Sequence, residues 1–182
     1  MLGLGNTLST QSTPLSSAPV GFDKTWNFDS DTESWTANNA NLSYQASYTP
    51  PSDTEKTGIL VIERTNASFE TSLSFVLNAL PDYDSSSVLY YEIVYSIPQI
   101  NPSGITYTGL NRVWYGGGGN YDDYTGINSQ TFNTWITVNG DLSPPAGAGD
   151  ALILTWDPSS FIYVAGAKIF IDSIRVSHTD FR

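Results

Sequence analysis

The chain has 182 residues, of which 7 are basic and 18 acidic, so its formal net charge is −11 at pH 7. Nucleic-acid-binding proteins carry a basic surface, and this charge therefore argues against a nucleic-acid partner. It disfavours binding to anionic membranes as well. Cysteine is absent, which excludes disulfides and, with a single histidine, argues against a zinc site. No apolar run approaches the ~18 residues of a membrane span.

The first 21 residues differ in composition from the rest of the chain. They are rich in Ser, Thr and Gly and have scattered leucines without periodicity, which is typical of a segment that does not fold alone. We interpret them either as a disordered tail or as an arm that orders against a partner subunit, with Leu2, Leu4 and Leu8 as its apolar surface. A basic start and a continuous apolar stretch are both missing, so no secretory signal peptide is predicted. We therefore divide the chain into an N-terminal arm, residues 1–21, and a folded domain, residues 22–182.

From residue 22 onward the sequence has the pattern of short β-strands. Apolar and polar residues alternate in three segments, at residues 42–48, 69–77 and 89–97, as in half-buried strands. Further strands are predicted at residues 59–62, where a continuous apolar run indicates a central strand, and at 105–115, 135–138, 152–156, 161–164 and 168–176. Roughly eight to ten strands separated by turn residues predict an all-β fold, a two-sheet antiparallel β-sandwich of the jelly-roll type.

Three motifs in this domain carry a family resemblance. They are Phe28-Asp29 with Trp35, then Thr134-Trp135-Ile136-Thr137-Val138, and then Ile169-Phe170-Ile171-Asp172-Ser173-Ile174. In this order they resemble the jelly-roll carbohydrate-binding modules of the xylan- and glucan-binding type, over about residues 22–178. That family opens with Phe-Glu/Asp and Gly-Trp, continues with a Trp-x-x-Val strand, and closes with Tyr/Phe-x-Ile-Asp-Asp-Val. Ser173 departs from the family pattern, because it replaces the second Asp of the closing motif.

The last predicted strand contains a carboxylate among apolar residues. Because side chains alternate along a strand, Asp172 is expected to share its side with Phe170, Ile174 and Val176. A buried carboxylate needs hydrogen-bond donors or a cation. Backbone N–H groups, Arg175 or Lys24 could satisfy it.

The family resemblance implies another partner for this carboxylate. Such modules commonly hold a structural calcium ion where the first strand meets the last, and residue-by-residue matching makes Asp29 and Asp172 its candidate ligands. Calcium takes oxygen ligands from carboxylates and backbone carbonyls. The resemblance therefore implies calcium as a structural cofactor, against the alternative of a carboxylate satisfied by the protein itself.

A glycine-rich segment with aromatic residues on both sides is the best candidate for a binding surface. Its four consecutive glycines, residues 116–119, do not hold a rigid shape. Aromatic rings pack on the C–H faces of sugars, and nearby Asn and Asp side chains bond sugar hydroxyls. The candidate carbohydrate-binding residues are Trp114, Tyr115, Asn120, Tyr121, Asp122 and Tyr124. The alternative is a flexible hairpin tip whose aromatic residues belong to the core or to a subunit contact.

Catalytic patterns are hard to find in this sequence. His178 is the one histidine, and we expect it to be solvated near the C-terminus; no serine has a nucleophile-elbow pattern. Two carboxylates could hydrolyse a glycoside, but nothing pairs Glu63, Glu70 or Glu92 with another acid. A small glycoside hydrolase or lyase therefore lacks a recognisable set of catalytic residues, and we predict that the protein is not an enzyme.

The opening Met1-Leu2-Gly3-Leu4-Gly5-Asn6 is similar to the start of many small tailed-phage virion proteins. This resemblance implies a non-enzymatic virion structural protein on the particle surface, of the capsid decoration, cement or fibre type. Residues 1–21 would attach it to capsid or tail subunits, and trimers are the expected assembly. The alternative hypothesis is a carbohydrate-binding module that adsorbs to cell-surface or environmental glycans.

Overall fold

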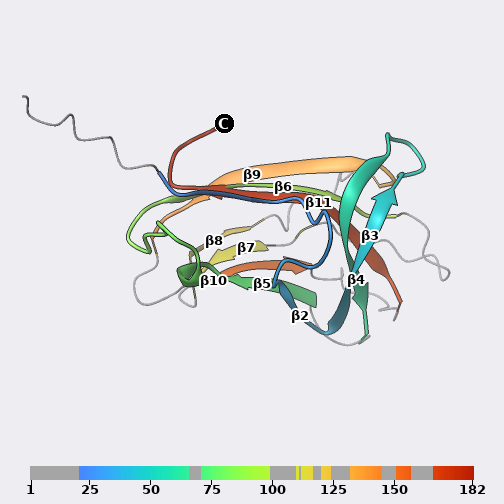
Figure 1. The fold of residues 1–182 in the computed structure, drawn as a ribbon, viewed down its shortest axis with the longest axis horizontal. Coiled ribbons are helices and arrows are strands. Elements are labelled where there is room, and N and C mark those ends of the chain that lie inside the picture. The colour runs from blue at the N-terminus through green and yellow to red at the C-terminus, as the bar shows by residue number, and fades with distance from the viewer. Residues whose placement is uncertain are drawn as a thin grey trace, which may run out of the picture.

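The computed structural model describes residues 21–65, 71–98, 110, 112–116, 120–123, 132–144, 151–156 and 166–182. Within these residues the chain forms eleven β-strands and one short 3₁₀ helix, η1 (Leu77–Ala79). The strands make two antiparallel sheets that lie one above the other (Figure 1). This confirms the predicted all-β sandwich of the jelly-roll type. Residues 1–20 lie outside the described residues, so the division into an arm and a domain stays a prediction.

The larger sheet has six strands. Five of them follow the order β3-β4-β11-β6-β9, and β1 pairs with β11 beside this path. We call it the six-stranded sheet. Its strands are β1 (Asp23–Trp26), β3 (Ala40–Tyr48), β4 (Lys56–Arg64), β6 (Leu89–Ser96), β9 (Trp135–Leu142) and β11 (Lys168–Ser177).

The second sheet has five strands in the order β2-β5-β10-β7-β8, and we call it the five-stranded sheet. Its strands are β2 (Thr36–Asn38), β5 (Thr71–Val76), β7 (Arg112–Tyr115), β8 (Asn120–Asp123) and β10 (Ala151–Trp156). The predicted strand at residues 161–164 lies outside the described residues. Among the described residues, no helix is long and apolar enough to cross a membrane.

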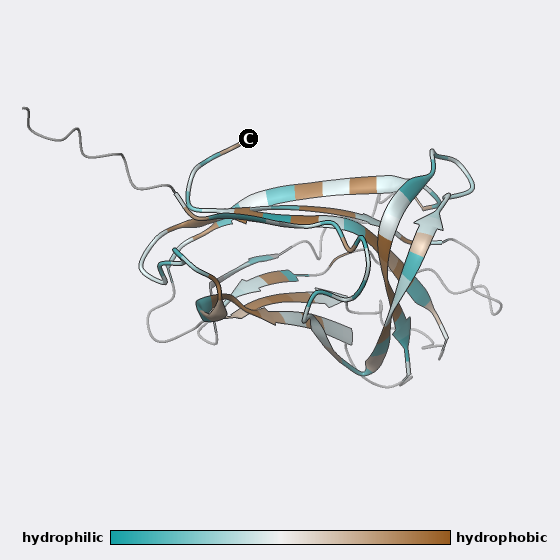
Figure 2. Cartoon of the chain, in the orientation of Figure 1, coloured by the Kyte–Doolittle hydropathy of each residue, from teal (hydrophilic) through white to brown (hydrophobic). Residues whose placement is uncertain are grey.

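The core fills the space between the two sheets. Figure 2 shows hydrophobic and hydrophilic residues alternating along β9, where Ile136 and Val138 pack against the core. At one side of the core three aromatic rings meet, since Trp26 lies 5.2 Å from Trp35 and 4.8 Å from Phe75 between ring centroids. The inward residues of each strand therefore hold the sheets together, and the residues between them point outward.

The last strand departs from the predicted alternation at Asp172. The register of β11 against β6 shifts between Ile171 and Ser173, because a β-bulge inserts one extra residue. Phe170 therefore packs on the outer side of the six-stranded sheet, whereas Ile174 and Val176 belong to the core. The expectation that these three residues share one side with Asp172 was wrong, because it assumed an uninterrupted strand.

A small aromatic cluster covers part of the outer side of the six-stranded sheet. The rings of Tyr48 and Phe170 stack at 3.6 Å with 4° between their planes, and Trp135 meets Tyr48 edge-on. Burial raises the pKa of the Tyr48 phenol. The indole N–H of Trp135 donates to the Thr54 carbonyl oxygen at 2.9 Å. These contacts fix the loop between β3 and β4 against the sheet.

Candidate functional site

The outer face of the five-stranded sheet gathers side chains that could contact a ligand. Residues directly opposite each other on paired strands share a face, so the register defines two rows that cross the sheet. The inward row between them consists of core residues such as Leu73, Leu154 and Val113. The first outward row is Thr36, Ser74, Ile153, Trp114 and Tyr121. The second is Asn38, Ser72, Thr155 and Arg112.

Aromatic rings and a guanidinium lie together at the β7–β8 end of this face. The ring centroids of Trp114 and Tyr121 are 4.6 Å apart with planes inclined by 44°. The Arg112 guanidinium carbon lies 4.9 Å from the centroid of Tyr121 and 5.5 Å from that of Trp114, within the range of cation–π attraction. Tyr121 remains 41% exposed. The arrangement presents a fixed aromatic surface to solvent.

Hydroxyl groups dominate the opposite end of the same face. The hydroxyls of Thr36 and Ser74 lie 2.9 Å apart, across β2 and β5. Near the centre, Thr155 is only 4% exposed, and its Oγ1 makes no hydrogen bond in the part of the chain that the structure describes. Buried hydroxyls ordinarily have a partner. The Thr155 hydroxyl is thus buried, and the hydroxyls that this face presents to solvent are those of Thr36, Ser72 and Ser74.

The structure separates the candidate sugar-binding residues into two sets. Trp114 and Tyr121 lie side by side on the outer face, as their register requires. Tyr115 points inward instead and is fully buried, with its hydroxyl 2.8 Å from that of Tyr83. A ring in this position belongs to the core and does not reach a ligand on the surface.

Asp122 also faces the interior. Its Oδ2 accepts a hydrogen bond of 2.6 Å from the buried Tyr91 hydroxyl, and this pair leaves no room for a Cβ at Gly140 of β9. Asp122 thus ties β8, at the edge of the five-stranded sheet, to β6 of the six-stranded sheet. Asn120 pairs with Tyr115 in the register, and Tyr124 lies outside the described residues.

Sequence reasoning missed Arg112 and Thr155 as members of one outward row of this sheet. The polar side of β5 was visible in its alternation, but only the strand order places Ser72 opposite Thr155 and Thr155 opposite Arg112. A threonine within the apolar run of β10 was the available signal. Alternation along one strand does not reveal which distant strand pairs with it, so the sequence pattern alone did not bring these residues together.

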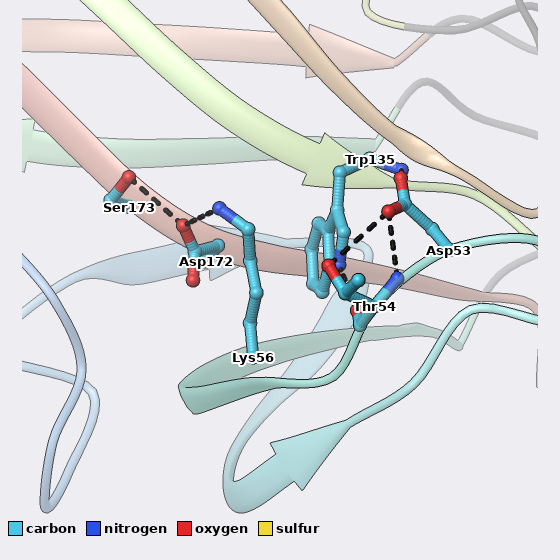
Figure 3. Close-up of polar contacts among 6 residues, drawn as sticks. All are labelled: Asp53, Thr54, Lys56, Trp135, Asp172 and Ser173. Carbon is cyan, nitrogen blue, oxygen red and sulfur yellow. Dashed lines mark hydrogen bonds and ion pairs between the residues drawn. The ribbon is translucent and has the colours of Figure 1, made fainter.

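The carboxylate of Asp172 contacts a lysine. Lys56 Nζ lies 2.6 Å from Asp172 Oδ2, and the Asp172 side chain is 18% exposed. Figure 3 shows Lys56 reaching between Asp172 and Trp135, whose ring centroid is 5.3 Å from Nζ. The two cations suggested by the sequence are engaged elsewhere, Arg175 with Asp23 and Lys24 with Glu33. Lys56 therefore supplies the positive charge that pairs with this half-buried carboxylate.

The residues around Asp29 fit a calcium ion in part. Asp29 Oδ1 and the Asn27 carbonyl oxygen lie against Gly58, where a Cβ would collide with the Asn27 oxygen; both are oxygens of the kind calcium takes. The described residues contain no group of three or more acidic, His or Cys side chains arranged for a metal. An ion at Asp172 would also have to displace the Lys56 ammonium. Calcium binding by Asp29 and Asp172 stays a prediction.

His178 is held in place on both sides of its ring. Nδ1 lies 2.8 Å from the Val88 carbonyl oxygen, and the Asp84 N–H donates to Nε2 at 3.1 Å. The expectation of a solvated histidine was wrong, because the turn before β6 packs over it. With both ring nitrogens bonded to backbone groups, His178 has a structural role.

The structure gives the surroundings of two of the three glutamates that were considered for hydrolysis. Glu63 forms an ion pair with Lys168 at 3.3 Å across β4 and β11. Glu92 lies opposite Arg175 in the register of β6 and β11. Glu70 lies outside the described residues. These positions do not bring a pair of the named glutamates together on neighbouring strands.

Comparison with known proteins finds similar structures but no matching sequence family. No family model and no curated protein matches the chain. The CBM22-1 xylan-binding domain of Paenibacillus barcinonensis Xyn10C is similar in structure, with a TM-score of 0.54 and 18% identity over 88% of this chain and 97% of that domain. The tandem CBM22-1–CBM22-2 domain of the same protein gives a TM-score of 0.54 and 20% identity over 89% of this chain and 47% of the tandem.

A third similar structure contains the same type of module next to a catalytic one. It is the CBM22-1–GH10 part of Clostridium thermocellum xylanase 10B complexed with xylohexaose, with a TM-score of 0.58 and 11% identity. The alignment covers 88% of this chain and 29% of that protein, so this chain spans less than a third of its length. At these identities the likeness establishes the fold, a jelly roll of the kind found in carbohydrate-binding modules.

Proposed function

We propose that this domain is a non-catalytic carbohydrate-binding module whose ligand lies across the outer face of the five-stranded sheet. The observation that carries the proposal is the contact of Trp114 with the exposed Tyr121 beside Arg112, on the same face as the hydroxyl groups of β2 and β5. Aromatic rings stack on sugar rings, and hydroxyl and amide groups fix their orientation.

The dimensions of the face suit an oligosaccharide. Neighbouring strands lie about 4.8 Å apart, so five strands span about 19 Å. A chain of sugars crossing the strands would stack on Trp114 and Tyr121 at one end. It would then pass over Thr155 and reach Ser72, Ser74 and Asn38 at the other end. Stacking supplies affinity here, and the polar groups supply specificity.

The similar structures support this proposal over a role in a virion. Those with the higher TM-scores include a domain described as xylan-binding and a module complexed with xylohexaose. The virion hypothesis rests on residues 1–21, of which all but one lie outside the described residues. Attachment to capsid or tail subunits, trimer formation and a location on a virus particle therefore stay predictions without structural support.

Binding measurements on surface variants test the proposal. Isothermal titration against soluble xylan, mixed-linkage β-glucan and mannan should show binding to at least one of them. Trp114→Ala and Tyr121→Ala should each weaken that binding by roughly thirtyfold, as truncating a central aromatic contact costs about 2 kcal/mol. Tyr44→Ala is the matched control, because Tyr44 is a 39% exposed aromatic residue on the other sheet. Absence of binding to every glycan, or equal binding by all variants, would refute the proposal.

A further inference from the structure

A small cavity lies between the two sheets, where β4 and β11 of one sheet approach β5 and β10 of the other. Its lining residues are Ile62, Arg64, Thr71, Trp156, Ala167 and Ile169. Three of these are polar residues in a position that is otherwise core: Arg64 is 5% exposed, and Thr71 and Trp156 are each 2% exposed. Such residues are rarely buried without a partner.

Two polar atoms at this cavity make no hydrogen bond in the part of the chain that the structure describes. They are the hydroxyl oxygen of Thr71 and the indole nitrogen of Trp156. The two residues face each other directly in the register of β5 and β10, so their side chains are neighbours on the inner face. The backbone there is satisfied, since Arg64 donates to Ala167 and accepts from Gly166. The two side-chain groups are therefore what a ligand would satisfy.

The chemistry of these two groups defines the ligand. An indole N–H only donates, whereas a threonine hydroxyl donates and accepts, so the partner must be an oxygen that accepts from Trp156. The edge-on contact of Trp156 with Tyr95, at 6.4 Å and 75°, holds the indole in its orientation. The available space is on the order of one water molecule.

We propose that a single ordered water occupies this cavity and bridges Trp156 Nε1 to Thr71 Oγ1. The water would be an internal part of the fold, because it would bond two side-chain groups that have no partner among the described residues. It would link β5 and β10 beneath Ser72 and Thr155, which lie on the outer face of the same two strands. This site is separate from the proposed sugar-binding surface and does not depend on it.

A high-resolution crystal structure of the full chain tests the proposal directly. We expect a well-ordered density peak about 2.7–3.2 Å from both Trp156 Nε1 and Thr71 Oγ1. The proposal is overturned if the density at this position is absent, or if a protein atom makes these two hydrogen bonds.

Two matched variants provide a test in solution. Trp156→Phe removes the N–H that would bind the water. Trp35→Phe removes another buried N–H that makes no hydrogen bond to a described residue, and Trp35 does not line this cavity. Both lose the same volume from the core. We expect Trp156→Phe to lower the Tm by roughly 2–4 °C more than Trp35→Phe. Adding Thr71→Val to Trp156→Phe should then change the Tm by less than Thr71→Val alone, since the shared water is already lost. A bridging water would be contradicted if Trp156→Phe and Trp35→Phe lowered the Tm equally and if the effects of Trp156→Phe and Thr71→Val on the Tm were additive.

Discussion

At the residue scale, Thr155 is a buried hydroxyl in an outward row of the five-stranded sheet. It is 4% exposed, and its Oγ1 makes no hydrogen bond to the residues that the structure describes. A valine has nearly the same shape and lacks the hydroxyl. The position therefore allows the cost of burying this hydroxyl to be measured without disturbing the strand.

We predict that Thr155→Val leaves glycan binding unchanged, because a ligand on the outer face does not reach the buried Oγ1. The Tm should stay the same or rise, since the variant no longer buries a polar group that lacks a partner among the described residues. Titration calorimetry and thermal melting measure the two effects. Thr137→Val, on the exposed side of β9 in the other sheet, is the control. Weaker glycan binding by Thr155→Val, or a lower Tm, would contradict this prediction.

Asp29 and Asp172 carry the calcium prediction at the same scale. If calcium binds only the folded chain, a free concentration about 100 times its dissociation constant adds about 2.7 kcal/mol of stability, or roughly 5–10 °C in Tm. We predict that excess EDTA removes this gain and that Asp29→Asn abolishes the response to calcium. Asp31→Asn is the control, because Asp31 is a nearby exposed carboxylate. Melting curves that superimpose with calcium and with EDTA would exclude the ion.

At the element scale, the turn before β6 is fixed by a carboxylate as well as by His178. Asp84 accepts hydrogen bonds from the Ser86 hydroxyl and N–H and from the Ser87 hydroxyl. These bonds lower the pKa of the Asp84 carboxyl from 3.8 to about 2. The ionised form is therefore favoured more in the folded chain than in the unfolded chain.

The sign of the pH dependence follows from this lowered pKa. The stabilisation from Asp84 is complete above the unfolded pKa of 3.8 and is lost as the pH falls through the folded value of about 2. We predict that Asp84→Asn reduces the loss of stability on acidification across this interval, measured by urea unfolding. Asp82→Asn, at a neighbouring exposed residue, should leave the slope as it is. The same acid sensitivity in both variants and in the unchanged protein would contradict this role.

The elements that could be predicted are those whose own pattern is regular. Alternation identified β3, β5 and β6, and the apolar run at residues 59–62 identified β4, which lies between β3 and β11. The strand β8 was taken for a loop, because Asn120, Asp122 and Asp123 are polar and Asp122 turns inward to Tyr91. The bulge at Asp172 was not visible either, since it exists only relative to β6.

At the scale of the whole molecule, the outer faces of the two sheets differ in the contacts that their side chains make. The six-stranded sheet carries the ion pairs of Lys56 with Asp172 and of Lys168 with Glu63, and Trp135 donates to the Thr54 carbonyl. The five-stranded sheet instead presents the half-buried ring of Trp114 and the exposed ring of Tyr121, with the Arg112 guanidinium beside them. Composition and alternation sufficed to predict the sandwich, whereas the choice of face needed the strand order.

The proposed binding face is tested most directly by identifying the residues whose NMR signals change when a glycan binds. The measurement is a two-dimensional ¹H–¹⁵N NMR titration of the full chain with the glycan that binds best, following the indole N–H signals. We predict that the Trp114 signal shifts on binding, together with backbone signals of Tyr121 and Thr155, while the Trp135 indole on the other sheet stays in place. Shifts centred on Trp135, with Trp114 unchanged, would contradict the proposed binding face.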